Sequence, residues 1–181
     1  MEEGFSERVK IDGIIGSQVF LSKIVLNPIL DSFADEKLLF NPPPSTENAV
    51  PLIFAFPNTY SVGITSLGYQ VVWATLAQRS DLQVSRLFTD VHEALPSQPE
   101  WVGFSISWEL DYVNLLGLLE FLQIPIRSSD RMDQHPLIFG GGTVLTANPE
   151  PFADFFDVIL VGDGEILLDA LIDAYQTIRF S

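Results

Sequence analysis

The feature that most constrains the fold is an alternation of short apolar runs with longer amphipathic runs, which begins at residue 51. Residues 52–56 are a continuous apolar run that ends at Pro57, as expected of a strand buried on both faces. Strands that alternate with helices favour a parallel sheet, so we predict an α/β fold with a flavodoxin-like, doubly wound, five-stranded parallel sheet. The predicted strands span residues 52–56, 84–88, 101–107, 136–139 and 158–161, and the predicted helices span residues 64–79, 109–122 and 165–178.

The first 50 residues do not share this alternation. Residues 11–25 mix apolar residues with glycine and serine and show no convincing period. Residues 41–45 contain three consecutive prolines, which fix φ and favour an extended chain. We therefore predict an N-terminal extension with a proline-rich linker over residues 1–50 and an α/β domain over residues 51–181.

Charge and cysteine content exclude several classes of protein. The chain has 24 acidic and 9 basic residues, a formal charge of −15, and no lysine after Lys37. Nucleic acids and anionic membranes both attract basic surfaces, so neither is an expected partner. The absence of cysteine excludes disulfides, thiolate nucleophiles and cysteine-ligated clusters within this chain. A signal peptide and a long apolar span are also lacking, which predicts a cytoplasmic protein.

The apolar content suggests a partner. The chain is 47% hydrophobic and 18% charged, below the roughly 25% charged residues of typical soluble domains. Some apolar surface is therefore expected to stay exposed in the isolated chain, and large exposed patches usually mark interfaces. We expect docking to another domain of the same protein or to a partner chain, or a homo-oligomer formed through this surface.

Ligands of doubly wound sheets bind outside the carboxyl ends of the strands, so the residues after each predicted strand form the candidate site. After the first strand, polar side chains can cap a helix or donate to a ligand such as phosphate. After the fourth, three consecutive glycines indicate a close approach of backbone to backbone or to a ligand. The predicted cofactor-binding residues are Asn58, Thr59, Gly63, Ser107, Gly140, Gly141, Gly142, Gly164 and Glu165.

The segment after the third predicted strand has two interpretations. Glu109 and Asp111 stand near a helix N-terminus, where the helix dipole favours carboxylates. Trp108 and Tyr112 could instead supply a flat wall for a large ligand. The residues leave both interpretations open.

Standard catalytic motifs are missing. The first predicted strand is not followed by Gly-x-Gly-x-x-Gly, and the chain has no Gly-x-x-x-x-Gly-Lys-Ser/Thr. His92 and His135 are its only histidines, and neither belongs to a nucleophile arrangement. We therefore predict neither catalytic nor metal-ligating residues in this chain.

Several segments together resemble a known family. They are residues 56–68, 103–114, 124–125, 140–142, 148–154, 156–157 and 162–165. In order and spacing they resemble the start of largely uncharacterised radical SAM proteins with a B12-binding-like domain, often labelled Fe–S oxidoreductases. The resemblance implies a cobalamin-binding-like N-terminal domain that precedes a barrel with a [4Fe–4S] cluster and S-adenosylmethionine. Because this chain has no cysteine, that C-terminal domain is expected to be absent from it, most simply through truncation.

The chain also departs from this family. Ser61 replaces a commonly acidic residue, and Thr143 replaces a common proline. Asn58 and Thr59 occupy the loop after the first strand, where classical cobalamin proteins have a cobalt-ligating histidine. His92 follows Asp90 as in the Asp-x-His-x-x-Gly cobalt-binding element, but the glycine is missing and the segment follows the second strand, so we interpret it as a chance match. Any cobalamin is therefore expected to bind without histidine ligation.

Three functions remain open at this stage. The leading hypothesis is an accessory domain of a radical SAM enzyme, an oxidoreductase or a methyl or radical transferase, that holds a corrinoid or positions substrate at the strand ends. The alternative is a cofactor-free docking module with the same fold. A flavin-binding relative of flavodoxin is the third and weakest hypothesis.

Overall fold

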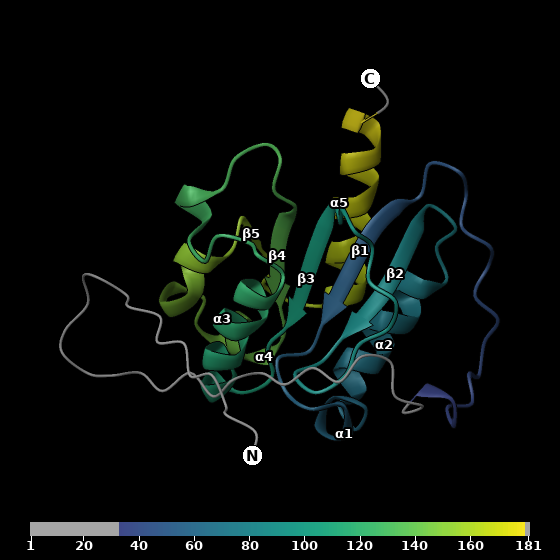
Figure 1. The fold of residues 1–181 in the computed structure, drawn as a ribbon, viewed down its shortest axis with the longest axis horizontal. Helices are drawn as coiled ribbons and strands as arrows, with labels where there is room; N and C mark the ends of the chain where they lie inside the picture. The colour runs from purple at the N-terminus through teal and green to yellow at the C-terminus, as the bar shows by residue number, and fades with distance from the viewer. Residues whose placement is uncertain (1–32, 180–181) are drawn as a thin grey trace, which may run out of the picture.

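A computed structural model describes residues 33–179 of the chain and shows a five-stranded, all-parallel sheet (Figure 1). The strand order is β2-β1-β3-β4-β5. This order confirms the predicted flavodoxin-like α/β class. The sequence segment 11–25 lies outside the described residues. The strands are β1 (Val50–Ala55), β2 (Leu82–Leu87), β3 (Trp101–Ser105), β4 (Leu137–Gly141) and β5 (Val158–Ile159).

The helices differ from the prediction in their detail. The predicted helix over 64–79 begins only at Leu67, because the Ser66 side chain accepts a hydrogen bond from the backbone N–H of Tyr69 and caps the helix there. A short helix over Tyr60–Gly63, which was not predicted, precedes it. The predicted helix over 109–122 begins with a 3₁₀ turn, and two short helical segments after β4 were not predicted. The helical elements are α1 (Tyr60–Gly63), α2 (Leu67–Ala77), η2 (Glu109–Asp111), α3 (Tyr112–Phe121), η3 (Ser128–Asp130), α4 (Thr143–Ala147), η4 (Glu150–Phe155) and α5 (Gly164–Arg179).

Apolar layers cover both faces of the sheet. Successive residues of β1 alternate between them: Ile53 joins the layer under α3 and α4, whereas Leu52 and Phe54 join the layer under α2 and α5. Helices thus cover both faces of β1, which explains why its sequence is a continuous apolar run rather than an alternating one. Within the described residues, no helix is long and apolar enough to cross a membrane.

Residues 33–49 of the predicted extension contact the sheet domain. Phe33 packs edge-on against Tyr60 of α1, and the Ser45 hydroxyl donates to the carbonyl of Leu82 in β2. These residues pass beside the edge strand β2 (Figure 1). They therefore cover an edge that would otherwise be open to pairing.

Candidate functional site

The strand order places a topological switch point between β1 and β3. From β1 the chain moves outward to β2, and it then crosses back to β3 on the other side of β1. The loops that follow β1 and β3 consequently leave in different directions, which opens a crevice at their carboxyl ends. The five parallel strands all end on this side of the sheet, where α1 also lies (Figure 1).

Asn58 and Asp111 meet across this switch point. The Asn58 Nδ2 group donates to Asp111 Oδ1 at 2.9 Å, and Asn58 Oδ1 accepts from the backbone N–H of Thr59 at 2.8 Å. The Asn58 carbonyl also accepts from the backbone N–H of Thr89, at 3.0 Å. Asn58 is therefore fixed in the loop after β1, with its amide aimed at the segment after β3.

Asp111 is a buried carboxylate with an unused oxygen. The residue is only 4% exposed, and its Oδ2 atom is buried without a hydrogen-bond partner. Burial raises the pKa of the Asp111 carboxyl above its ordinary value, and the hydrogen bond from Asn58 partly opposes that rise. A buried polar atom without a partner is costly, so the unpaired Oδ2 acceptor calls for an explanation.

An open pocket of about 370 Å³ surrounds this pair. Its aromatic and aliphatic walls are exposed, since Trp108 is 62% and Leu110 84% accessible to solvent. Its charged groups are carboxylates, and no basic side chain lines it. The lining residues are Asn58, Trp108, Glu109, Leu110 and Asp111.

The structure brings one predicted site residue, Asn58, into this pocket and surrounds several predicted glycines with protein. A Cβ at Gly63 would stand 2.5 Å from the Phe88 ring, and one at Gly140 would stand 2.6 Å from the Phe156 ring. The close approach that these glycines allow is therefore to side chains of the same domain. Their part in ligand binding remains a prediction.

The other glycines differ among themselves. Gly142 has a φ of 113°, and a Cβ there would stand 2.5 Å from the Ile106 carbonyl oxygen. At Gly141 the nearest atom would be 3.7 Å away, and at Gly164 it would be a Val72 methyl at 3.1 Å. Gly142, directly after β4, thus lets the backbone there lie against that of Ile106, directly after β3, which is one of the two alternatives that the sequence left open.

The remaining predicted residues lie around the same edge. The hydroxyl groups of Thr59 and Ser61 are hydrogen-bonded to each other at 3.1 Å. Ser107 directly precedes Trp108, and Glu165 is exposed in the first turn of α5. The prediction omitted Asp111 from the cofactor-binding residues and explained it, like Glu109, by the helix dipole, although it allowed that Trp108 and Tyr112 could form a ligand wall in the same segment. The sequence does not show which of the two nearby carboxylates is buried, and in the structure Asp111 is buried whereas Glu109 is exposed.

His92 does not reach the pocket residues. Its Nδ1 atom lies 2.6 Å from the Glu93 carbonyl oxygen, and its ring packs 5.9 Å from the Phe121 ring. These contacts agree with the interpretation of the Asp-x-His match as a loop. Across residues 33–179, no group of three or more potential ligands is arranged to hold a metal ion.

Fold and site together define a doubly wound α/β domain with a polar crevice at its switch point. The family model described as "Radical SAM proteins, N-terminal" matches residues 73–181, so the chain belongs to this family. The chain is also similar to uncharacterized protein MJ0966 of Methanocaldococcus jannaschii, with 26% identity over 110 residues. That alignment covers 61% of this chain and 23% of the relative, so the chain spans about a quarter of the relative's length. No solved structure matches the chain.

Proposed function

We propose that this N-terminal domain of a radical SAM protein holds a ligand at the carboxyl ends of β1 and β3. The observation that carries the proposal is Asp111, whose Oδ2 atom is buried in the pocket wall without a partner while Oδ1 is bound by Asn58. A buried, unpaired carboxylate oxygen lowers the stability of the fold, and unfavourable groups of this kind are found most often at functional sites. The domain would present the ligand to the chemistry of the radical SAM part.

The pocket favours a ligand that donates hydrogen bonds. Asp111 Oδ2 and the Glu109 carboxylate are acceptors, and no arginine, lysine or histidine lines the pocket. The exposed Trp108 ring offers a flat apolar surface beside these acceptors. A large ligand with amide groups at its rim and an apolar ring meets both requirements.

A corrinoid has this chemistry, and the pocket residues fit it without a histidine ligand. Amide groups at the corrin rim would donate to Asp111 Oδ2, with the position of Asp111 set by Asn58 and one edge of the macrocycle against Trp108. When bound, a corrinoid would supply methyl or radical transfer. The domain's own residues would bind and orient it, and Asp111 would hold no cobalt.

The loop after β1 argues against a flavin phosphate. A phosphate cradle needs free backbone N–H groups at a helix N-terminus. Here the N–H of Thr59 is bound by Asn58 Oδ1, that of Tyr60 by Asp90 Oδ1, and that of Gly63 by the Thr59 carbonyl. An aspartate already occupies the place of the anion, so the geometry favours a neutral or cationic donor.

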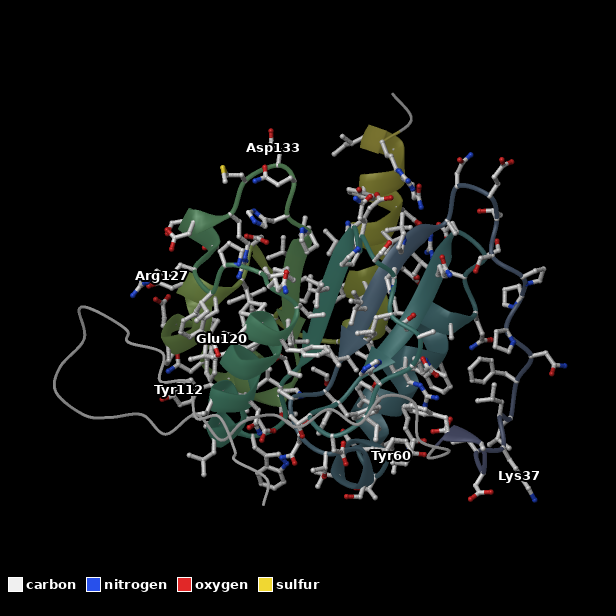
Figure 2. All side chains as sticks on the ribbon, in the orientation of Figure 1. Lys37, Tyr60, Tyr112, Glu120, Arg127 and Asp133 are labelled. Atoms are coloured by element: carbon white, nitrogen blue, oxygen red, sulfur yellow. The ribbon has the colours of Figure 1, made fainter. Side chains whose placement is uncertain are left out.

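The test is a titration of the purified chain with cobalamin, followed by visible absorption. We expect saturable binding with a base-off spectrum. The Asp111→Asn variant should bind at least about tenfold more weakly, because an amide nitrogen would replace the acceptor Oδ2. Asp133→Asn removes the same charge at the opposite end of the sheet (Figure 2) and should bind like the unmodified chain.

Three results would count against parts of this proposal. Absence of saturable binding by the unmodified chain removes the corrinoid. Equal affinities of the unmodified chain and Asp111→Asn would place the ligand elsewhere. Binding of added flavin mononucleotide would favour the flavodoxin-like alternative.

A second candidate function, a docking module, is favoured by exposed apolar side chains at the same edge. These side chains follow β1, β3 and β5, whose carboxyl ends share one edge of the sheet. Burial of such a surface against the radical SAM domain would remove it from water. We call this surface the apolar rim; it consists of Val62, Leu67, Trp108, Leu110, Val161 and Ile166.

Photo-crosslinking tests the docking module in the radical SAM protein that carries this domain. A benzophenone amino acid at position 110 should crosslink to the radical SAM domain. The same group at position 39, where Leu39 is 99% exposed away from the apolar rim, should not. Equal crosslinking from both positions, or crosslinks only between two copies of this domain, would contradict the proposed contact.

A further inference from the structure

Residues 33–45, which we call the strap, run antiparallel to β2. Phe33 packs near Phe88, just beyond the carboxyl end of β2, with ring centroids 6.3 Å apart. At the other end, Ser45 Oγ donates to the carbonyl of Leu82, the first residue of β2. Figure 1 shows this segment passing beside the sheet edge. The strap therefore has fixed contacts at both ends of the strand.

Arg86 of β2 anchors the middle of the strap. Its side chain is 3% exposed, and its Nη1 and Nη2 atoms donate to the two carboxylate oxygens of Glu36 at 2.9 and 2.7 Å. The guanidinium carbon also lies 4.7 Å from the Phe33 ring centroid and 4.2 Å from that of Trp73. This bidentate ion pair between aromatic rings holds the Glu36 carboxylate in one orientation.

The fixed carboxylate then reaches the loop after β1. The Tyr60 hydroxyl donates to Glu36 Oε1 at 2.7 Å. Tyr60 begins α1, and its backbone N–H donates to Asp90 Oδ1 at 2.8 Å. Tyr60 is two residues from Asn58, so contacts at its ring and at its backbone both restrict the loop that carries Asn58. Figure 2 shows Tyr60 at the end of the sheet opposite Asp133.

We infer that Glu36 is a positioning residue, which acts through Tyr60 to fix the loop after β1 so that Asn58 faces Asp111. The inference rests on the proposed function for its consequence in ligand binding, but its structural part is independent of any ligand. The Glu36–Tyr60 bond connects the strap to the loop through side chains 24 residues apart. Loss of this bond should free the loop and leave the sheet intact.

Tyr60→Phe is the direct test, because it removes the hydroxyl and keeps the ring that packs on Phe33 and Phe88. Hydrogen exchange should become about tenfold faster at the amides of residues 58–64, as expected for a lost bond to a charged group. Exchange in β1, β3 and β4 should not change. The affinity for cobalamin, where the unmodified chain binds it, should fall about fivefold.

Tyr175→Phe is the matched control. The Tyr175 hydroxyl donates to Glu100 Oε2 at 2.7 Å, a bond of the same kind, and Glu100 directly precedes β3, at the amino ends of the strands and away from the loop after β1. Its loss should leave residues 58–64 unchanged. A second pair of variants tests Glu36 itself: Glu36→Gln keeps an acceptor oxygen for Tyr60 and should largely preserve slow exchange in the loop, whereas Glu36→Ala should not.

The outcomes separate this inference from the proposed function. Exchange in residues 58–64 that is unchanged in a folded Tyr60→Phe variant overturns the positioning role, and so does a uniform acceleration across the whole sheet. Absence of cobalamin binding by the unmodified chain counts against the corrinoid alone, because the exchange measurement needs no ligand. Local acceleration with unaltered affinity would overturn the link between the strap and binding.

Discussion

The Asn58 amide donates to the Asp111 carboxylate at 2.9 Å, across 53 residues of sequence and between the loops that follow β1 and β3. This bond uses one carboxylate oxygen and leaves the other buried without a partner. The pair therefore both closes the switch point and provides its free acceptor. Asp111→Asn keeps an oxygen for the Asn58 bond and removes the titrating carboxyl, so it should weaken ligand binding while changing how stability depends on pH.

Asp111→Asn is expected to change the pH dependence of stability. Burial raises the pKa of Asp111 in the folded protein above 3.8, so the folded protein holds this proton more tightly than the unfolded chain. The resulting contribution to stability is fully present below the unfolded-state pKa and is lost as the pH rises through the folded-state pKa. Asparagine does not titrate, and it therefore lacks this loss.

Urea unfolding from acidic to neutral pH measures this difference. The free energy of unfolding of Asp111→Asn, minus that of the unmodified chain, should grow as the pH rises. Asp133→Asn, at an exposed position, serves as the control and should show no such trend. A difference that stays constant, or that shrinks with rising pH, would contradict the raised pKa of Asp111.

Gly142→Ala and Gly141→Ala should differ strongly although the two glycines are neighbours. Gly142 has a φ of 113° and its added Cβ would stand 2.5 Å from the Ile106 carbonyl oxygen. We expect Gly142→Ala to lower the free energy of unfolding by about 2 kcal/mol or more. An added Cβ at Gly141 would stand 3.7 Å from the Leu160 carbonyl oxygen, so Gly141→Ala should change the free energy of unfolding by less than about 1 kcal/mol. Similar losses in the two variants, measured by urea unfolding, would refute this assignment.

Gly103 and Phe139 form a complementary pair in neighbouring strands. They are in register between β3 and β4, and a Cβ at Gly103 would stand 2.1 Å from the Phe139 ring. Gly103→Ala should therefore cost about 1–3 kcal/mol through overpacking. Adding Phe139→Leu should recover part of that loss, because leucine is shorter. Additive losses in the double variant would show that the two side chains do not compete for the same space.

The architecture could be predicted because strands buried on both faces favour apolar runs, as in residues 52–56, 136–139 and 158–161, and all five predicted strands are strands in the structure. The helices were less predictable. The helix predicted over 64–79 starts only after Ser66, whose side chain accepts a bond from the Tyr69 N–H, and apolar periodicity does not detect such a cap. The five-residue α4 is too short to show a period. The number and order of the strands were therefore clear from the sequence, whereas the short helices and the helix boundaries depended on individual side chains.

The candidate site was predictable only in its location. The rule that ligands bind beyond the carboxyl ends of strands indicated Asn58, but its partner Asp111 is distant in sequence and its burial follows from packing alone. Glycines mark close approach without showing what approaches. At Gly63 the neighbour is Phe88, a side chain of the same domain, and the sequence pattern would be identical for a ligand.

Arg86 should be the least replaceable charged residue within residues 33–179. Its buried side chain binds Glu36 and Glu93, and in Arg86→Met these two carboxylates would face each other without the cation that they share. We expect this variant to lose about 3–5 kcal/mol, as for other buried ion pairs that lose one partner. Arg127→Met breaks an exposed pair with Asp154 and should cost less than about 1 kcal/mol.

A triple variant separates the charge of Arg86 from its packing. Adding Glu36→Gln and Glu93→Gln to Arg86→Met removes the two carboxylates that the substitution leaves unpaired. Urea unfolding should then show recovery of at least about half of the loss, because the methionine side chain can still pack between Phe33 and Trp73. If the triple variant is no more stable than Arg86→Met alone, the contribution of Arg86 lies in its aromatic contacts, and the ion pair only orients the strap.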